Sequence, residues 1–272
     1  RSTLFPYTTL FRSGRRTPKS APRRWALVLC AALVCALVPS LAALAESYTG
    51  TDYSWYRGHE AEQSYRLEST AQMRAFANIV NGTADVDADG TLEPADAFAG
   101  KKLVLDNVFP INFQGEHVAP IGSAEHPFAG SFDGNGRTVD NFKIVSTDTD
   151  GLSRNIGLFG YVGASGSITN LAIGSAASIE VVRTAPEASA IENVGMVAGY
   201  CGGTISGCSN NGSLSVRSAA EQKSKAAYLM ISFVGGVAGQ CVFDMDDCSN
   251  AGPVMVAPTR SEERRVGKEC RS

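Results

Sequence analysis

The residues best suited to chemistry form an acidic loop between positions 85 and 96. Carboxylates occupy loop positions 1, 3, 5 and 12, a glycine occupies position 6, and a threonine occupies position 7 (Asp85, Asp87, Asp89, Asp96, Gly90 and Thr91). This spacing is typical of calcium loops, where hard oxygen ligands converge around a tight turn. We therefore expect Asp85, Asp87, Asp89, Thr91 and Asp96 to bind calcium. A solvated acidic turn is the alternative, because Asp96 is shorter than the usual Glu and Pro94 blocks a following helix.

A second group of carboxylates could support glycoside hydrolysis. Asp244 and Asp246 alternate along the chain beside Asp247, and Asp133 and Asp140 lie further back. Hydrolysis requires two carboxylates about 5–10 Å apart. No basic cluster accompanies these residues, and the sequence contains neither a phosphate-binding loop nor a dinucleotide fingerprint on a strand–helix unit. We therefore expect a non-catalytic protein with no cofactor other than calcium.

The cysteines show a regular spacing. Four of them form two pairs, each 40 residues apart: Cys201 with Cys241, and Cys208 with Cys248. Because Cys208 and Cys248 occupy a column in which Phe142 and Leu171 stand in earlier repeats, we expect reduced thiols that point into the core. Disulfides are the alternative, with three possible connectivities if the protein is exported. The spacing typical of zinc sites is absent.

Both ends of the chain are set aside before the fold is considered. Residues 1–13 and 260–272 are interpreted as sequencing-adaptor artefacts, because codons for the first segment can be the reverse complement of codons for the second. Residues 14–45 are predicted to be a signal peptide, with a basic start, an apolar stretch over 25–38 and a small-residue cleavage pattern at 43–45. That apolar stretch is shorter than the roughly 20 residues of a membrane span.

The charge of the mature part differs from that of the whole chain. The formal net charge of −3 includes the basic ends, whereas residues 46–259 contain 12 Lys and Arg against 24 Asp and Glu, a net charge of −12. An acidic surface disfavours nucleic acid and anionic lipid as partners. We expect a secreted or cell-surface protein that does not insert into a membrane after signal removal, and that is monomeric.

The region 46–122 is predicted to form an N-terminal cap and a first coil. Residues 65–68 can form a strand, and Ser69 or Thr70 can begin a helix that ends at Asn81-Gly82. Its apolar residues recur at helical spacing (Met73, Phe76, Ala77 and Val80). A stack of repeats needs its first hydrophobic edge covered, and we expect this amphipathic helix to cover it.

The region 123–259 is predicted to be a β-solenoid. One apolar pattern recurs four times, beginning at Val139, Ile168, Ile205 and Met245, and glycine-rich turns lie between (157–160, 195–199 and 235–239). If these copies align, the interior column Phe142, Leu171, Cys208 and Cys248 has spacings of 29, 37 and 40 residues. Stacking would make each apolar position a continuous column. Inserted segments around 146–155, 174–193 and 217–233 would then leave the stack along one edge.

The order of motifs resembles exported bacterial proteins that carry GLUG motifs. The motifs are Phe98-Ala99-Gly100-Lys101, then Pro120-Ile121-Gly122, then Phe132-Asp133-Gly134-Asn135-Gly136, followed by the glycine-rich turns. This resemblance spans roughly residues 65–256. It implies an all-β fold, a right-handed parallel β-helix with a short capping helix, displayed on a bacterial surface.

These observations favour an adhesin-like protein that binds a host or matrix protein or glycan through loops on the solenoid. Two alternatives remain. The chain could be a fragment of a β-helix carbohydrate-active enzyme or of a surface protease, or it could be a passive spacer.

Overall fold

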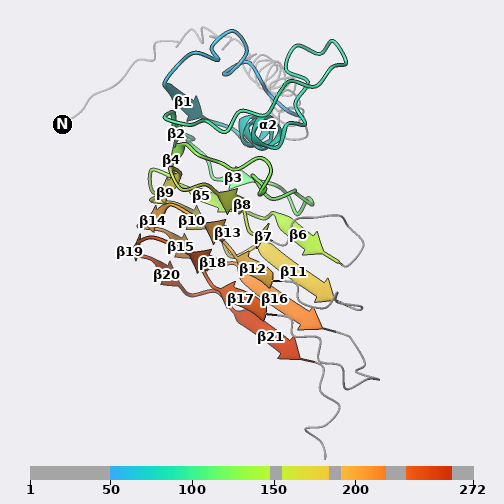
Figure 1. Ribbon diagram of the computed structural model, residues 1–272, viewed down its shortest axis with the longest axis vertical. Helices are drawn as coiled ribbons and strands as arrows, with labels where there is room; N and C mark the ends of the chain where they lie inside the picture. The colour runs from blue at the N-terminus through green and yellow to red at the C-terminus, as the bar shows by residue number, and fades with distance from the viewer. Residues whose placement is uncertain (1–49, 148–154, 184–190, 219–230, 259–272) are drawn as a thin grey trace, which may run out of the picture. The chain divides into compact units, whose positions relative to one another are not determined.

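The computed structural model describes residues 50–147, 155–183, 191–218 and 231–258 (Figure 1). The predicted adaptor segments and signal peptide lie outside these residues. The chain divides into two compact units, 1–46 and 47–272, and every described residue belongs to the second. Within the described ranges, no helix is long and apolar enough to span a membrane.

The N-terminal part contains strand β1 (Ser64–Leu67) and helix α2 (Thr70–Asn81). Ser69 caps the helix, because its side chain accepts a hydrogen bond from the backbone amide of Gln72 at 3.2 Å. Gly82 ends the helix with a φ of 66°, a left-handed conformation that glycine adopts without strain. The apolar face of α2 is buried, as its helical spacing predicted, and the start and end of the helix are confirmed.

The strands of the described chain, β1 included, form five parallel sheets with the following bounds. The first sheet contains β1, β2 (Lys102–Leu105), β4 (Ser131–Asp133), β9 (Ser167–Thr169), β14 (Thr204–Ser206) and β19 (Met245–Asp246). The second contains β3 (Ile111–Asn112), β5 (Thr138–Asp140), β10 (Ala172–Ile173), β15 (Ser209–Asn210) and β20 (Ser249–Asn250). The third contains β6 (Lys143–Ser146), β11 (Ser178–Arg183), β16 (Ser213–Ser218) and β21 (Val254–Pro258). The fourth contains β7 (Asn155–Ile156), β12 (Ile191–Gly195) and β17 (Ile231–Gly235), and the fifth β8 (Phe159–Val162), β13 (Ala198–Cys201) and β18 (Ala238–Cys241).

The chain visits the five sheets in this order and then returns to the first, which makes a parallel β-solenoid. Figure 1 shows strands of successive coils side by side, for example β6, β11, β16 and β21. The first coil continues past β3 through isolated parallel bridges from His117, Ile121 and Phe128 to residues of the next coil. The predicted all-β solenoid with one short helix is therefore confirmed.

The core is a set of apolar columns, one for each inward position of the coil. In the first sheet, Leu103, Phe132 and Ile168 lie in register and are fully buried. Ile205 continues this column. Aromatic rings fill the space between α2 and the first coils: Phe76 lies 5.8 Å from Phe132, measured between ring centroids. The helix therefore covers the apolar end of the stack, as predicted.

One predicted register is wrong. The apolar pattern predicts that Val139 aligns with Ile168, but Ile168 pairs with Phe132, and Val139 pairs with Ile173. The first coil-to-coil spacing is therefore 36 residues, from Phe132 to Ile168, and not 29. The later spacings of 37 and 40 residues are confirmed, because Ile168 pairs with Ile205 and Ile205 with Met245. The error arose because each coil carries apolar-rich strands in adjacent sheets, so a pattern can match its neighbour within the coil.

The predicted insertion over 174–193 is also corrected. Most of its described residues are paired: Ser178–Arg183 forms β11 and Ile191–Gly195 forms β12. The inward positions of β11 alternate with half-buried ones, so this strand has the period of two that a sheet requires. Residues 184–190 of the predicted insertion lie outside the described residues.

Candidate functional site

The acidic loop brings three of its predicted ligands together. Carboxylate oxygens of Asp85, Asp87 and Asp89 all lie within 4.8 Å of one another. The loop turns at Gly90, whose φ is 89°. Backbone amides partly hold the arrangement: the amide of Asp89 donates to Asp85 Oδ1 at 3.1 Å and to Asp87 Oδ1 at 3.2 Å. Three hard oxygen ligands on an exposed turn form an incomplete shell, since Ca²⁺ takes 6–8 oxygens and water would supply the rest.

Thr91 joins the group through Asp89. Its hydroxyl donates to Asp89 Oδ1 at 2.6 Å, and its backbone amide donates to the same oxygen at 2.8 Å. The hydroxyl bond lowers the pKa of Asp89, and the amide bond adds to that effect. Asp89 is thus held in its charged form, the form that binds a cation.

The structure does not bring Asp96 to this group. Its Oδ2 accepts a hydrogen bond from the hydroxyl of Tyr56 at 2.9 Å and pairs with the Lys101 ammonium at 2.5 Å. Its Oδ1 accepts from the backbone amide of Phe98 at 2.7 Å. The reason is local: the backbone amide of Asp96 bonds the carbonyl of Ile79 at the end of α2, so the chain has turned away from the loop. Asp96, the predicted ligand at loop position 12, therefore pairs with Tyr56 and Lys101 of the N-terminal cap and does not join the acidic loop.

Two of the carboxylates considered for hydrolysis, Asp133 and Asp140, stabilise turns. Asp133 accepts from the backbone amide of Asn135 at 2.9 Å and lies 3.3 Å from the Lys102 ammonium. Asp140 accepts from the amides of Asn141 at 2.7 Å and of a residue in the next coil at 2.9 Å. Burial opposes the charged form of Asp133, but its hydrogen bonds and the ammonium outweigh burial and lower its pKa.

Asp244, Asp246 and Asp247 lie exposed in the last described coil. Asp246 accepts a hydrogen bond from the backbone amide of Asp247 at 3.0 Å, and Asp247 has a positive φ of 50°. Among the described residues, the only acidic group of three or more that converges closely enough for a metal is Asp85, Asp87 and Asp89. Asp246 resembles Asp140 of an earlier coil, which also accepts from the amide of the residue that follows it.

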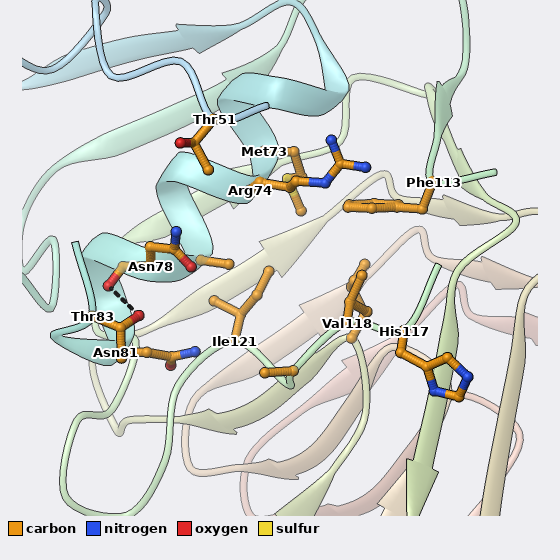
Figure 2. A pocket seen from close by; sticks show the side chains of 13 residues that line it. Thr51, Met73, Arg74, Asn78, Asn81, Thr83, Phe113, His117, Val118 and Ile121 are labelled. Atoms are coloured by element: carbon orange, nitrogen blue, oxygen red, sulfur yellow. Dashed lines mark hydrogen bonds between the residues drawn. The ribbon is translucent and has the colours of Figure 1, made fainter. Parts of the chain in front are cut away.

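A pocket of about 250 Å³ lies between α2 and the first coil (Figure 2). Figure 2 shows side chains of α2 on one side and those of Phe113, Val118 and Ile121 on the other. Its lining is mainly apolar, with polar groups at the rim. Its volume falls below the range of about 300–1,000 Å³ that ligand pockets span, so it suits a small molecule at most.

Two polar side chains that line this pocket, Asn81 and Arg74, are held by contacts with other residues of the protein. Asn81 donates to the Pro120 carbonyl at 3.0 Å and accepts from the Gly122 amide at 2.8 Å. Arg74 pairs with Glu116 and lies over the Phe113 ring, 5.5 Å from its centroid. Sequence spacing does not predict this pocket, because its walls come from segments far apart in the chain. These contacts join the helix to the first coil.

A buried ion pair joins the two strands that flank segment 184–190, and it was not among the features predicted from the sequence. Nε of Arg183 lies 2.6 Å from Oε1 of Glu192, and a second guanidinium nitrogen donates to the Ser146 hydroxyl at 2.9 Å. The side chains are only 5% and 0% exposed. One signal was available: Arg183 follows Ile179 and Val181 in the inward phase of β11. A charged residue in that phase requires a buried partner.

No family model matches this chain. The chain is similar to Halomucin from Haloquadratum walsbyi (strain DSM 16790 / HBSQ001), with 26% identity over 170 residues. This match covers 58% of the chain and 2% of Halomucin. No solved structure matches.

Proposed function

We propose that this chain is part of a non-catalytic, adhesin-like protein, secreted or displayed on a cell surface, that binds a host or matrix protein or glycan. The observation that carries this proposal is the shared register of three connections. Segments 148–154, 184–190 and 219–230 each run from a strand of the third sheet to a strand of the fourth. Variable segments on one edge of a regular stack are the usual binding elements of repeat proteins.

The bases of these connections are held by specific contacts. Arg183, where β11 ends, is paired in register with Ser218, where β16 ends. On the returning side, Asn193 lies in register with Asn155, and its amide donates to the Asn155 side chain at 2.7 Å. The ion pair between Arg183 and Glu192 joins the two ends of segment 184–190. The strand ends that flank these segments are therefore fixed by the scaffold.

Charge and comparison support the same proposal. A net charge of −12 over residues 46–259 favours neutral or basic ligands over nucleic acid or anionic lipid. The similarity to Halomucin, of which the chain matches 2%, suits a piece of a very long protein. The turn-bound carboxylates Asp133 and Asp140 support a non-catalytic role.

The test replaces segments 184–190 and 219–230 with short glycine-containing turns and measures binding to immobilised glycans and matrix proteins. The replacement must end before Ile191, because β12 and the buried Glu192 begin there. We expect an unchanged melting temperature and a loss of binding. A matched variant that shortens the exposed loop around Val108 and Phe109 should bind like the parent.

Two outcomes would contradict this proposal. If the trimmed protein binds as well as the parent, the trimmed segments are not the binding site. If the parent binds none of the immobilised molecules, this part of the protein acts as a spacer.

A further inference from the structure

The two cysteine pairs lie in register in adjacent coils. Cys201, where β13 ends, pairs with Cys241, where β18 ends. Cys208 precedes Ser209 and Cys248 precedes Ser249, and these two serines lie in register. The backbone amide of Ser249 donates to the Cys208 carbonyl at 2.9 Å. Each cysteine therefore lies one strand spacing, about 4.8 Å, from the other member of its pair. All four are unbridged in this structure.

The thiols of Cys201 and Cys241 both contact the backbone of Gly203. The Cys241 thiol donates to the carbonyl of Gly203 at 3.8 Å, reaching back to the preceding coil. The backbone amide of Gly203 donates to the Cys201 sulfur, and the Cys201 and Cys241 thiols are also hydrogen-bonded to each other. Two thiols in direct contact lie close enough to react with each other.

Cys208 and Cys248 adopt matching orientations. The Cys208 thiol donates to the Ser206 carbonyl at 3.4 Å, and the Cys248 thiol donates to the Asp246 carbonyl at 3.2 Å. Ser206 and Asp246 are themselves in register. The Cys248 thiol also reaches back to a carbonyl of the preceding coil at 3.9 Å. The two thiols of the second pair therefore make equivalent contacts in adjacent coils.

We propose that Cys201 with Cys241, and Cys208 with Cys248, are modification sites that close into two disulfides between coils when the folded protein meets a disulfide-donating oxidant. A strand spacing of about 4.8 Å lies within the Cα separations of about 4.4–6.8 Å that disulfides span. This inference goes beyond the proposed binding function and does not depend on it.

Each bond forms by two exchange steps. The partly exposed Cys241, as thiolate, attacks one sulfur of the donor disulfide and releases the first donor thiol. The thiolate of buried Cys201 then attacks Sγ of Cys241 and releases the second donor thiol. Two protein thiols are oxidised and one donor disulfide is reduced to two thiols, which take up the two protons. Cys248 and Cys208 react in the same way.

The second step should be slow at neutral pH. Burial raises the pKa of Cys201 to about 12, and the neighbouring Cys241 adds to the rise. Burial likewise raises the pKa of Cys208 to about 11. Only the thiolate attacks, so the rate should rise up to about tenfold for each unit of pH below these values.

The experiment uses the folded full chain with Cys30, Cys35 and Cys270 replaced by serine. It is treated with oxidised glutathione at about pH 8.5, where more thiolate is present, and then alkylated and mapped by peptide mass spectrometry. We expect links between Cys201 and Cys241 and between Cys208 and Cys248. The melting temperature should rise by about 5–10 °C, and dithiothreitol should reverse the rise.

Matched variants distinguish the two pairs. Cys241→Ser should keep the bond between Cys208 and Cys248, and Cys248→Ser should keep the bond between Cys201 and Cys241. Four alkylated thiols after treatment, glutathione adducts alone, links within one coil or links between molecules would each overturn the proposal. If a serine variant fails to fold, the map of the parent protein decides the question alone.

Discussion

The buried ion pair between Arg183 and Glu192 offers a quantitative test of how the stack holds its third and fourth sheets together. We predict that Arg183→Met strongly destabilises the protein. Methionine keeps much of the arginine's apolar length, so the variant mainly removes the guanidinium. It leaves the Glu192 carboxylate, which is 0% exposed, without the cation 2.6 Å away. Breaking a buried pair in this way costs about 3–5 kcal/mol of unfolding free energy.

The protein contains a matched control in the third sheet. Arg217 on β16 pairs with Glu180 on β11 at 3.4 Å, but these side chains are 56% and 42% exposed. Exposed pairs contribute about 0–1 kcal/mol. Arg217→Met should therefore change the unfolding free energy by no more than that. Both variants remove one arginine from the same sheet, so they differ mainly in burial.

Urea unfolding followed by far-UV circular dichroism measures both variants. A third variant, Arg183→Met with Glu192→Leu, replaces the whole pair by apolar groups and should recover most of the loss, since such replacements are often neutral or stabilising. If Arg183→Met costs no more than Arg217→Met, the pair contributes nothing through burial and our reasoning about the inward phase of β11 is refuted.

Four further predictions address the cap, the acidic loop and the turns. Millimolar calcium should raise the melting temperature, and Asp87→Ala but not Glu125→Ala should abolish the shift; an unchanged midpoint in the parent would leave a solvated acidic turn. Ser69→Ala should cost about 1 kcal/mol of unfolding free energy in urea, because the α2 cap is lost. Gly134→Ala should lower the melting temperature, because an added Cβ would lie 2.5 Å from the Leu171 Cα; an unchanged value would show that the coils can separate there. The pKa of Asp133 is lower in the folded protein than in the unfolded chain, so the charged carboxylate stabilises the fold above the unfolded pKa, and this stabilisation is lost as pH falls through the folded pKa. Asp133→Asn should therefore weaken the pH dependence of the unfolding free energy below about pH 4.

The sequence predicted the parts of the fold that depend on local chemistry. The start of α2 at Ser69, its end at Gly82 and its buried face all follow from capping and helical spacing. Register depends instead on contacts between residues more than 30 positions apart. Two different registers can satisfy the same apolar pattern. Which of them forms depends on which set of side-chain columns fills the interior. Phe132 belongs opposite Ile168 in the first sheet, and the local pattern starting at Val139 does not contain it.

The candidate site was predicted in part for the same reason. Asp85, Asp87 and Asp89 are close in sequence, so a single turn brings them together. Asp96 depends on a distant partner, because Tyr56 lies 40 residues away and Lys101 belongs to the next turn. The pocket beside α2 combines residues from the helix and from the first coil, and sequence spacing carries no information about such a combination.

The exposed apolar residues of the last described coil follow from the same column logic. Leu214 is 1% exposed, whereas Val254, its register partner in the next coil, is 40% exposed. Val216 and Val256 differ in the same way, at 7% and 55%. The side chains are similar in kind, so the difference comes from position: each inner column is buried by the coil that follows it. The stability of a coil in this fold is therefore set as much by its neighbours as by its own sequence, which is the expected behaviour of a solenoid.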